Sequence, residues 1–141
     1  MKKCVIESGK FKAAGIDIDE VITASPEFFS SLSKLWKNAG TCVHIVSSRC
    51  DIPDAKQATI EELQTLGIVY DHLYLLPSIE VAQIKCQHRE LDWYQKYLWQ
   101  KVDYCLKHGI EKFYDDDTKV VQLFRIFAPD IEVVHYVNCT D

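Results

Sequence analysis

Two aspartates separated by one residue carry the strongest chemical signal in this sequence. Asp17 and Asp19 lie at the end of an apolar stretch, 12–18, that is typical of a buried strand. A carboxylate in such a position has to be desolvated or paired, and both states cost free energy. Proteins tolerate that cost mostly for chemistry, so the pair suggests a nucleophile beside an acid/base group, with a divalent cation between them and a phosphate.

Two further polar clusters each follow a short apolar segment. One is the triplet Ser47, Ser48 and Arg49 after Thr41–Val46, and the other is the run of three aspartates at 115–117. Phosphoryl transfer needs a nucleophile, groups that neutralise the phosphate charge and a proton donor for the leaving oxygen. Read alone, the aspartate run could simply cap a helix that begins at residue 118. Together with the first pair it favours a phosphate and Mg²⁺ site.

Segments of strand type alternate with segments of helical type along the chain. Strands are expected at residues 12–18, 41–46, 73–76, 112–114 and 131–136, with a weaker one at 4–7. Helices are expected after Ser25, at 53–66, at 88–108 and at 118–126. This alternation predicts an α/β fold, a doubly wound and mostly parallel sheet with helices on both faces. The carboxyl ends of parallel strands share one edge, so the three polar clusters should converge there.

Length and composition describe one ordinary globular domain, 1–141. The formal net charge of −5 argues against broad attachment to nucleic acid or to an anionic membrane, although it allows contact with a nucleic-acid end. No apolar run is long enough to span a membrane, and the basic start at 1–4 is not followed by an apolar stretch. We therefore expect a cytoplasmic protein without a membrane partner.

The cysteines and histidines show no metal-type spacing. None of the six cysteines forms a C-x-x-C pair, and closely spaced Cys or His pairs of the kind that bind zinc are not found. His44 is expected to be an interior histidine of its strand, and Cys42 a small buried apolar side chain. The tryptophans are expected in the core or in helix packing, with the alternative that Trp93 and Tyr94 line the open mouth of the site. Reduced thiols and no zinc site are the expectation.

These residues resemble the four motifs of the haloacid dehalogenase (HAD) superfamily of aspartate-nucleophile phosphohydrolases. The first motif, D-x-D-x-[T/V] after a buried strand, is similar to Asp17–Val21, and the second, a strand that ends in Ser or Thr, is similar to Cys42–Arg49. The third, a lysine followed by a helix and Gly-Ile, is similar to Lys101–Ile110. The fourth, an apolar strand that ends in an acidic pair, is similar to Phe113–Asp116.

The resemblance implies a five-stranded sheet with the order 3-2-1-4-5 and a role for each aligned residue. It implies that Asp17 is the nucleophile and that Asp19 is the general acid/base. The phosphate-binding residues it implies are Ser47, Ser48, Arg49 and Lys101. The ligands of a Mg²⁺ cofactor that it implies are Asp17, Asp19 through its backbone carbonyl, and Asp115, with Asp116 either a ligand or a residue that holds one.

The aligned lysine departs from the family pattern. The family lysine opens its helix, whereas Lys101 lies inside the long helix expected at 88–108. Either that helix breaks near Trp99, or Lys96 takes the role. Lys101 is favoured, because the segment from there to Asp115 fits one helix and a short strand.

A substantial cap domain is not expected. Residues 19–25 leave no space for an insertion, and Pro77–Arg89 allow only a small excursion. The resemblance is thus to capless members, whose open sites commonly serve bulky substrates or borrow cover from a second subunit.

The expected function is a Mg²⁺-dependent phosphatase that forms an aspartyl-phosphate on an unidentified phosphomonoester, either a small molecule or a macromolecular end. The alternative is a catalytically inactive HAD-like binding or accessory module. A phosphoacceptor receiver domain fits less well, because its acidic pair follows the first strand and its phosphoacceptor the third. In this sequence the acidic pair ends the fourth strand, and no acid follows the third.

Overall fold

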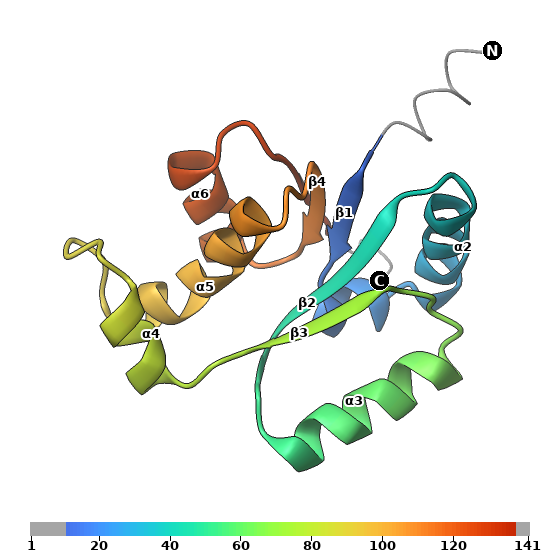
Figure 1. Ribbon diagram of the computed structural model, residues 1–141, viewed down its shortest axis with the longest axis horizontal. Coiled ribbons are helices and arrows are strands. Elements are labelled where there is room, and N and C mark those ends of the chain that lie inside the picture. Colours follow the sequence, from blue (N-terminus) through green and yellow to red (C-terminus); the bar gives the residue numbers. More distant parts are fainter. Residues whose placement is uncertain (1–10, 138–141) are drawn as a thin grey trace.

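The computed structural model describes residues 11–137, and its strands form one parallel sheet (Figure 1). The order is β3-β2-β1-β4-β5, and every neighbouring pair is parallel. The α/β class and the 3-2-1-4-5 order are therefore confirmed. The weaker strand expected at 4–7 lies outside the described residues. The strands are β1 (Ala13–Ile16), β2 (Cys42–Cys50), β3 (His72–Leu76), β4 (Lys112–Asp115) and β5 (Glu132–His135).

Helices cover both faces of the sheet. Figure 1 shows α2 and α3 on one face and α5 and α6 on the other, with α4 packed beside α5. A short turn of π-helical type, η1, follows β1 directly. The bounds are η1 (Ile18–Ile22), α2 (Pro26–Asn38), α3 (Pro53–Thr65), α4 (Ile79–Lys85), α5 (Trp93–Lys107) and α6 (Thr118–Phe127). No helix within residues 11–137 is long and apolar enough to cross a membrane.

The sheet separates two apolar cores. Phe29 and Trp36 of α2 pack with Ile16 and Ile45 on one face. On the other face Phe113 packs with the apolar side chains of α5 and α6. All four residues of β1 are buried, as expected for a central strand covered on both faces. Burying each large apolar side chain stabilises the fold by about 1.5–3 kcal/mol, and the two cores hold the carboxyl ends of β1 and β4 in place.

Gly15 makes the close approach between β1 and β4 possible. A Cβ at this position would lie 2.7 Å from Cδ1 of Phe113, which is closer than carbon atoms can pack. We expect Gly15→Ala to lower the free energy of unfolding by about 1–3 kcal/mol, the usual cost of overpacking. Urea unfolding measures this cost. In the background of Phe113→Leu, where the smaller side chain leaves room for the new Cβ, Gly15→Ala should cost less. An equal cost of Gly15→Ala in both backgrounds would contradict the steric explanation.

The bounds of the first two strands differ from those expected. β1 ends at Ile16 rather than at residue 18, because the chain turns into η1 and buries Ile18 there. β2 does not end at residue 46 but continues to Cys50, because β3 pairs along its end with a register shift between Ser47 and Cys50. The triplet 47–49 is thus part of β2 rather than of the loop after it.

The helix expected at 88–108 begins at Trp93 instead. Asp92 caps it by accepting the Gln95 backbone N–H at 2.7 Å, and Gln95 returns the bond by accepting the Asp92 N–H at 2.9 Å. This reciprocal capping box fixes the start of α5. The excursion expected at Pro77–Arg89 contains the seven-residue α4, and no cap domain is evident among the described residues.

Candidate active site

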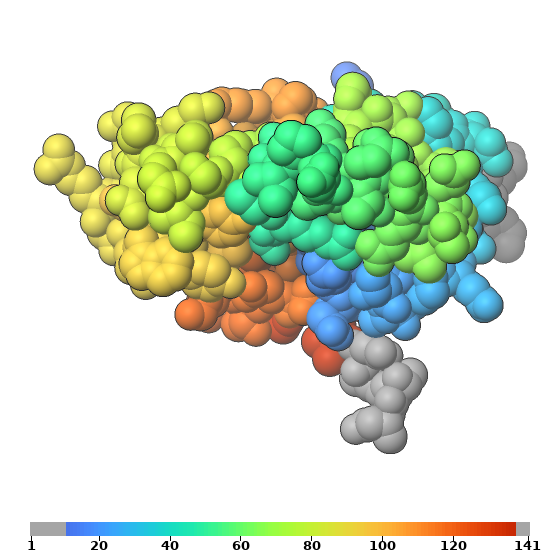
Figure 2. Space-filling view, turned by 90° about the horizontal axis from the view of Figure 1, so that it is seen from below, coloured from blue at the N-terminus to red at the C-terminus, as the bar shows by residue number. Residues whose placement is uncertain are grey.

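Three elements bring acidic and basic side chains together at the carboxyl edge of the sheet. Asp17 follows β1 directly, and its backbone N–H still donates to the Tyr114 carbonyl of β4 at 3.0 Å. Asp115 is the last residue of β4. Lys101 reaches the same place from α5. Figure 2 looks at this side of the molecule, where the blue surface of η1 lies between α3 in green and the orange β4–α6 segment.

Lys101 joins the two aspartates in a buried ion-pair cluster. Its Nζ lies 3.0 Å from Oδ1 of Asp17 and 2.7 Å from Oδ2 of Asp115. The three side chains are 1%, 5% and 0% exposed, respectively. Charges removed from water to this extent are tolerated only when they are paired and hydrogen-bonded, and each of these is. The cluster orients the Asp17 carboxylate and holds it next to the end of β4.

The pKa values within this cluster follow from one ammonium shared between two carboxylates. Burial raises the pKa of Asp17 strongly, and Lys101 offsets only part of the rise. Burial would lower the pKa of Lys101, but the attraction of Asp17 and Asp115 outweighs it and the pKa is raised. Lys101 is therefore charged at any physiological pH. Its single positive charge is shared between two carboxylates, so it cannot balance both of them when they are ionised.

Asp116 adds a third carboxylate to this group. One oxygen from each of Asp17, Asp115 and Asp116 lies within 4.8 Å of the others. Burial, and then the charge of Asp115, raises the pKa of Asp116. Hard oxygen donors with surplus negative charge are the ligand set that Mg²⁺ prefers, so these three residues fit the metal. The side chain of Asp19 does not belong to this group of oxygens; the resemblance implied its backbone carbonyl as the metal ligand, which stays a prediction.

The third aspartate of the run has a structural role. Asp117 is the N-cap of α6, and its side chain accepts the Lys119 backbone N–H at 2.8 Å. Its own backbone N–H donates to Oδ1 of Asp115 at 2.9 Å. The helix-capping interpretation therefore applies to Asp117, while Asp115 and Asp116 face the candidate site.

Asp19 is bound by an arginine. Nε and Nη2 of Arg49 donate to its two carboxylate oxygens at 3.0 and 2.8 Å. The chain turns sharply after Asp19, since Glu20 has a left-handed φ of 65° and its N–H donates to Thr23 Oγ1. A side chain other than glycine rarely adopts such a φ, and strain of this kind is common at functional sites. The turn leaves Asp19 half-exposed, facing the end of β2.

Arg49 is itself held from α3. Its Nη1 donates to Thr59 Oγ1 at 3.0 Å and to Glu62 Oε1 at 2.8 Å. The hydrogen bonds from Arg49 are the main reason why the pKa of Asp19 is lowered. Sequence analysis did not predict Thr59 or Glu62. The available signal was their spacing of three residues on a helix, which places them on one face.

Arg49→Ala should raise the pKa of Asp19 toward the ordinary value of about 3.9. In the parent protein the folded-state pKa is depressed, so this group stabilises the fold above its unfolded-state pKa, and the contribution is lost as pH falls. Carboxyl NMR titration measures the shift directly. Lys56→Ala, which removes an exposed cation from α3, is the control and should leave Asp19 unchanged. An Asp19 pKa equally low in Arg49→Ala would contradict this account.

The two serines of the triplet differ in burial and in hydrogen bonding. Ser47 is fully buried, and its hydroxyl accepts the Arg49 backbone N–H at 3.1 Å. Ser48 is exposed, and its carbonyl accepts a hydrogen bond from the Tyr97 hydroxyl at 2.8 Å. Ser47 is thus placed beside Arg49 at the end of β2, whereas the Ser48 backbone ties β2 to α5.

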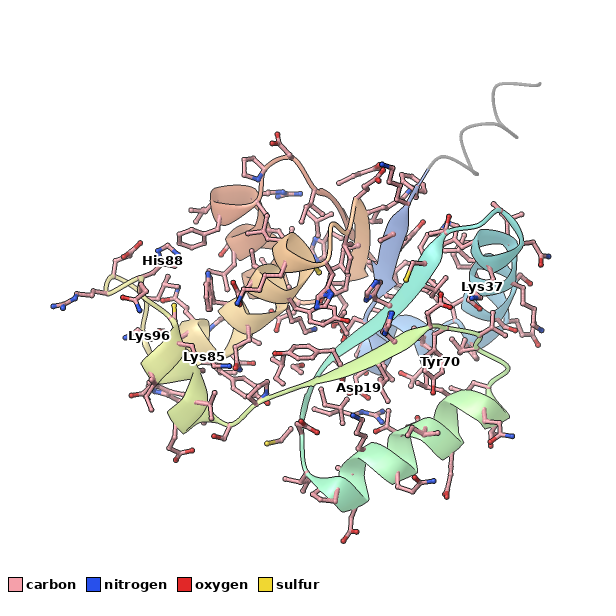
Figure 3. All side chains as sticks on the ribbon, in the orientation of Figure 1. Asp19, Lys37, Tyr70, Lys85, His88 and Lys96 are labelled. Carbon is pink, nitrogen blue, oxygen red and sulfur yellow. The ribbon has the colours of Figure 1, made fainter. Side chains whose placement is uncertain are left out.

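The structure brings Lys101 to the aspartates without the helix break that the family pattern suggested. α5 is continuous from Trp93 to Lys107, and Lys101 reaches Asp17 from its middle. Lys96, the alternative, lies beside α4 and away from Asp19 in Figure 3. The geometry therefore places Lys101 at the site.

An aromatic pocket adjoins this edge of the sheet. Trp93, Tyr94 and Tyr97 of α5 line it together with Cys50 of β2 and Ile79 of α4. Trp93 is 56% exposed and lines this pocket, so of its two expected positions it takes the one at the mouth rather than the one in the core, whereas Trp36 is buried as expected. Because Tyr97 also contacts Ser48, the pocket begins where β2 ends.

Comparison with known proteins shows a fold and no family. No protein-family model matches the chain, and no curated protein sequence does. A chain of the Pnkp1/Rnl/Hen1 complex is similar in structure, with a TM-score of 0.61, 16% identity, and coverage of 94% of this chain and 48% of that one. A chain of the Pnkp1/Rnl/Hen1 RNA repair complex has a TM-score of 0.56 at 17% identity, over 91% of this chain and 43% of that one. This chain therefore spans less than half of either, and identities this low show the fold alone.

Proposed function

We propose that this protein is a Mg²⁺-dependent phosphatase of the HAD type, which hydrolyses phosphomonoesters through an aspartyl-phosphate on Asp17. The observation that carries the proposal is the buried cluster in which Lys101 holds Asp17 and Asp115, with Asp116 beside them. Burial and the bond to Lys101 fix the orientation of the Asp17 carboxylate, as a nucleophile requires. The neighbouring carboxylates supply the negative charge that attracts a divalent metal ion.

In the proposed first step, a carboxylate oxygen of Asp17 attacks phosphorus and the bond to the leaving oxygen breaks. Asp19 donates its proton to that oxygen, and the phosphoryl group stays on Asp17. A water molecule, which gives a proton to Asp19, then attacks phosphorus and releases inorganic phosphate. Lys101 orients Asp17 throughout. Mg²⁺, held by Asp17, Asp115 and Asp116, would neutralise phosphoryl charge.

Asp19 can act as an acid only when Arg49 releases it, because the hydrogen bonds from Arg49 favour the ionised form. An incoming phosphate dianion is an anion that can replace Asp19 on the guanidinium. Nε and Nη2 of Arg49, which donate to Asp19 when no substrate is bound, would then donate to the substrate phosphate. This exchange would couple substrate binding to the protonation of Asp19.

Phosphorylated RNA ends are the substrate class that we favour. Two structures similar to this chain come from the Pnkp1/Rnl/Hen1 complex, one of them described as an RNA repair complex. The exposed Trp93 and Tyr94 beside the site offer faces on which a terminal base can stack. The net charge of −5 opposes binding of long nucleic-acid tracts, but one end held by stacking and by a phosphate site is compatible with it.

A substrate panel tests the proposed function. The panel contains RNA oligonucleotides with a 3′- or 5′-phosphate, sugar phosphates and p-nitrophenyl phosphate, each with Mg²⁺ or with a chelator. We expect phosphate release that requires Mg²⁺, with the highest kcat/KM on an RNA end. Release only from small phosphates would overturn the substrate class and leave the reaction intact. No release from any compound, together with no binding of BeF₃⁻, would support the inactive accessory module instead.

A further inference from the structure

A second group of potential metal ligands lies at the opposite edge of the sheet. Cys42 is the first residue of β2, His44 is the third, and His72 is the first residue of β3. Because the strands are parallel, these amino-terminal positions lie away from the carboxyl edge that carries Asp17. Sγ of Cys42 and one ring nitrogen from each histidine all lie within 4.8 Å of one another. The spacing argument against a zinc site is therefore incomplete, because it considers only neighbours along the chain.

The sheet itself explains how the three side chains meet. Cys42 and His44 are two residues apart on one strand, so their side chains point to the same face. His44 and His72 are direct partners in the β2–β3 register, and their rings lie 4.8 Å apart. Strand alternation and register thus assemble a group that no local motif encodes.

The distances are close to those of a tetrahedral metal centre. Zn–S and Zn–N bonds of about 2.3 and 2.0–2.1 Å place sulfur and nitrogen about 3.5 Å apart in a tetrahedron. Cys42 Sγ and His44 Nε2 are 3.4 Å apart. His72 is exposed, so its ring can rotate to complete the site.

The surroundings of His44 direct one nitrogen toward the cysteine. Its Nδ1 is hydrogen-bonded to the Tyr104 hydroxyl at 2.7 Å, which leaves Nε2 facing Sγ of Cys42. Metal-bound histidines typically have such a partner on the second nitrogen.

The site is open to solvent on one side and has a negative neighbour. A shallow hollow reaches Cys42 and His72, and Asp71 and Lys37 form an ion pair at its wall. Figure 3 labels Lys37 at the end of α2, away from Asp19. An ion could enter through this hollow and keep a water molecule or a fourth ligand there.

We propose that Cys42, His44 and His72 bind one borderline-soft divalent ion of the Zn²⁺ class, which joins the edge strand β3 to β2. One sulfur and two imidazole nitrogens are donors that suit zinc, whereas the oxygen donors around Asp17 suit Mg²⁺. The two sites are thus separated by both position and ligand chemistry. This proposal does not depend on phosphatase activity.

Metal titration of the reduced 141-residue protein tests the proposal. We expect one Zn²⁺ per chain by calorimetry, a rise in the thermal midpoint with Zn²⁺, and a thiolate-to-metal charge-transfer band with Co²⁺. Cys42→Ser should remove the band, and His72→Ala, at an exposed position, should abolish tight binding without unfolding the protein. Tyr104→Phe should weaken binding by about 10–100-fold, because Tyr104 only orients His44.

Cys50→Ser is the matched control, because Cys50 is an exposed thiol at the other end of the same strand. It should bind Zn²⁺ like the parent. Absence of the charge-transfer band in the parent would overturn the proposal. So would equal Zn²⁺ affinity in Cys42→Ser or in His72→Ala.

Discussion

Asp17→Asn is expected to abolish Mg²⁺-dependent phosphate release, with kcat reduced by about 10⁴-fold or more, because removal of a nucleophile leaves only binding and electrostatic contributions. An amide of the same size keeps the shape of the site but cannot form the acyl-phosphate. Hydrolysis of p-nitrophenyl phosphate measures the loss. Acid quenching of the parent during turnover should trap phosphate on Asp17.

Asp51→Asn is the control for this variant, because it removes an exposed carboxylate directly after β2, near the same edge of the sheet. Its kcat should equal that of the parent. Urea unfolding of Asp17→Asn separates loss of chemistry from loss of fold. Turnover at the parental rate in a folded Asp17→Asn protein would rule out this residue as the nucleophile.

Lys101→Met is expected to cost about 3–5 kcal/mol of stability, the largest effect on folding that we anticipate. The substitution removes the ammonium and leaves the carboxylates of Asp17 and Asp115 buried without a cation. Removing one partner of a buried ion pair typically has this cost, because the charge that remains is neither hydrated nor paired. Urea unfolding without metal measures the cost, and added Mg²⁺ should recover part of it.

Lys96→Met is the matched control, because the same substitution is made one and a half turns earlier on α5, at a half-buried residue. It should change stability by no more than about 0.5 kcal/mol, as is usual for surface sites. Combining Lys101→Met with Asp115→Asn should cost less than the sum of the single changes. A larger loss in Lys96→Met than in Lys101→Met would reverse the assignment of the lysine.

Much of the fold could be predicted from local pattern. Pro26 and Pro53 each begin a helix, and the segments between apolar strands have the length of helices. The errors lie where local pattern is ambiguous. The helical period continues upstream of Trp93, and only the capping box at Asp92 marks the true start of α5. The end of β2 depends on its pairing with β3, and this pairing cannot be predicted from residues 47–50 alone.

The edge of the sheet at which Asp17 and Asp115 meet follows from the order of strands and helices along the chain, because parallel strands place their carboxyl ends together. The contacts within each site do not follow from that order. Lys101 reaches Asp17 because α5 packs on this face of the sheet, against β2 and β3. Arg49 binds Asp19 because η1 turns toward β2, and His72 meets His44 because of the strand register. Each depends on the packing of segments far apart in sequence, so it is fixed only when the two cores form.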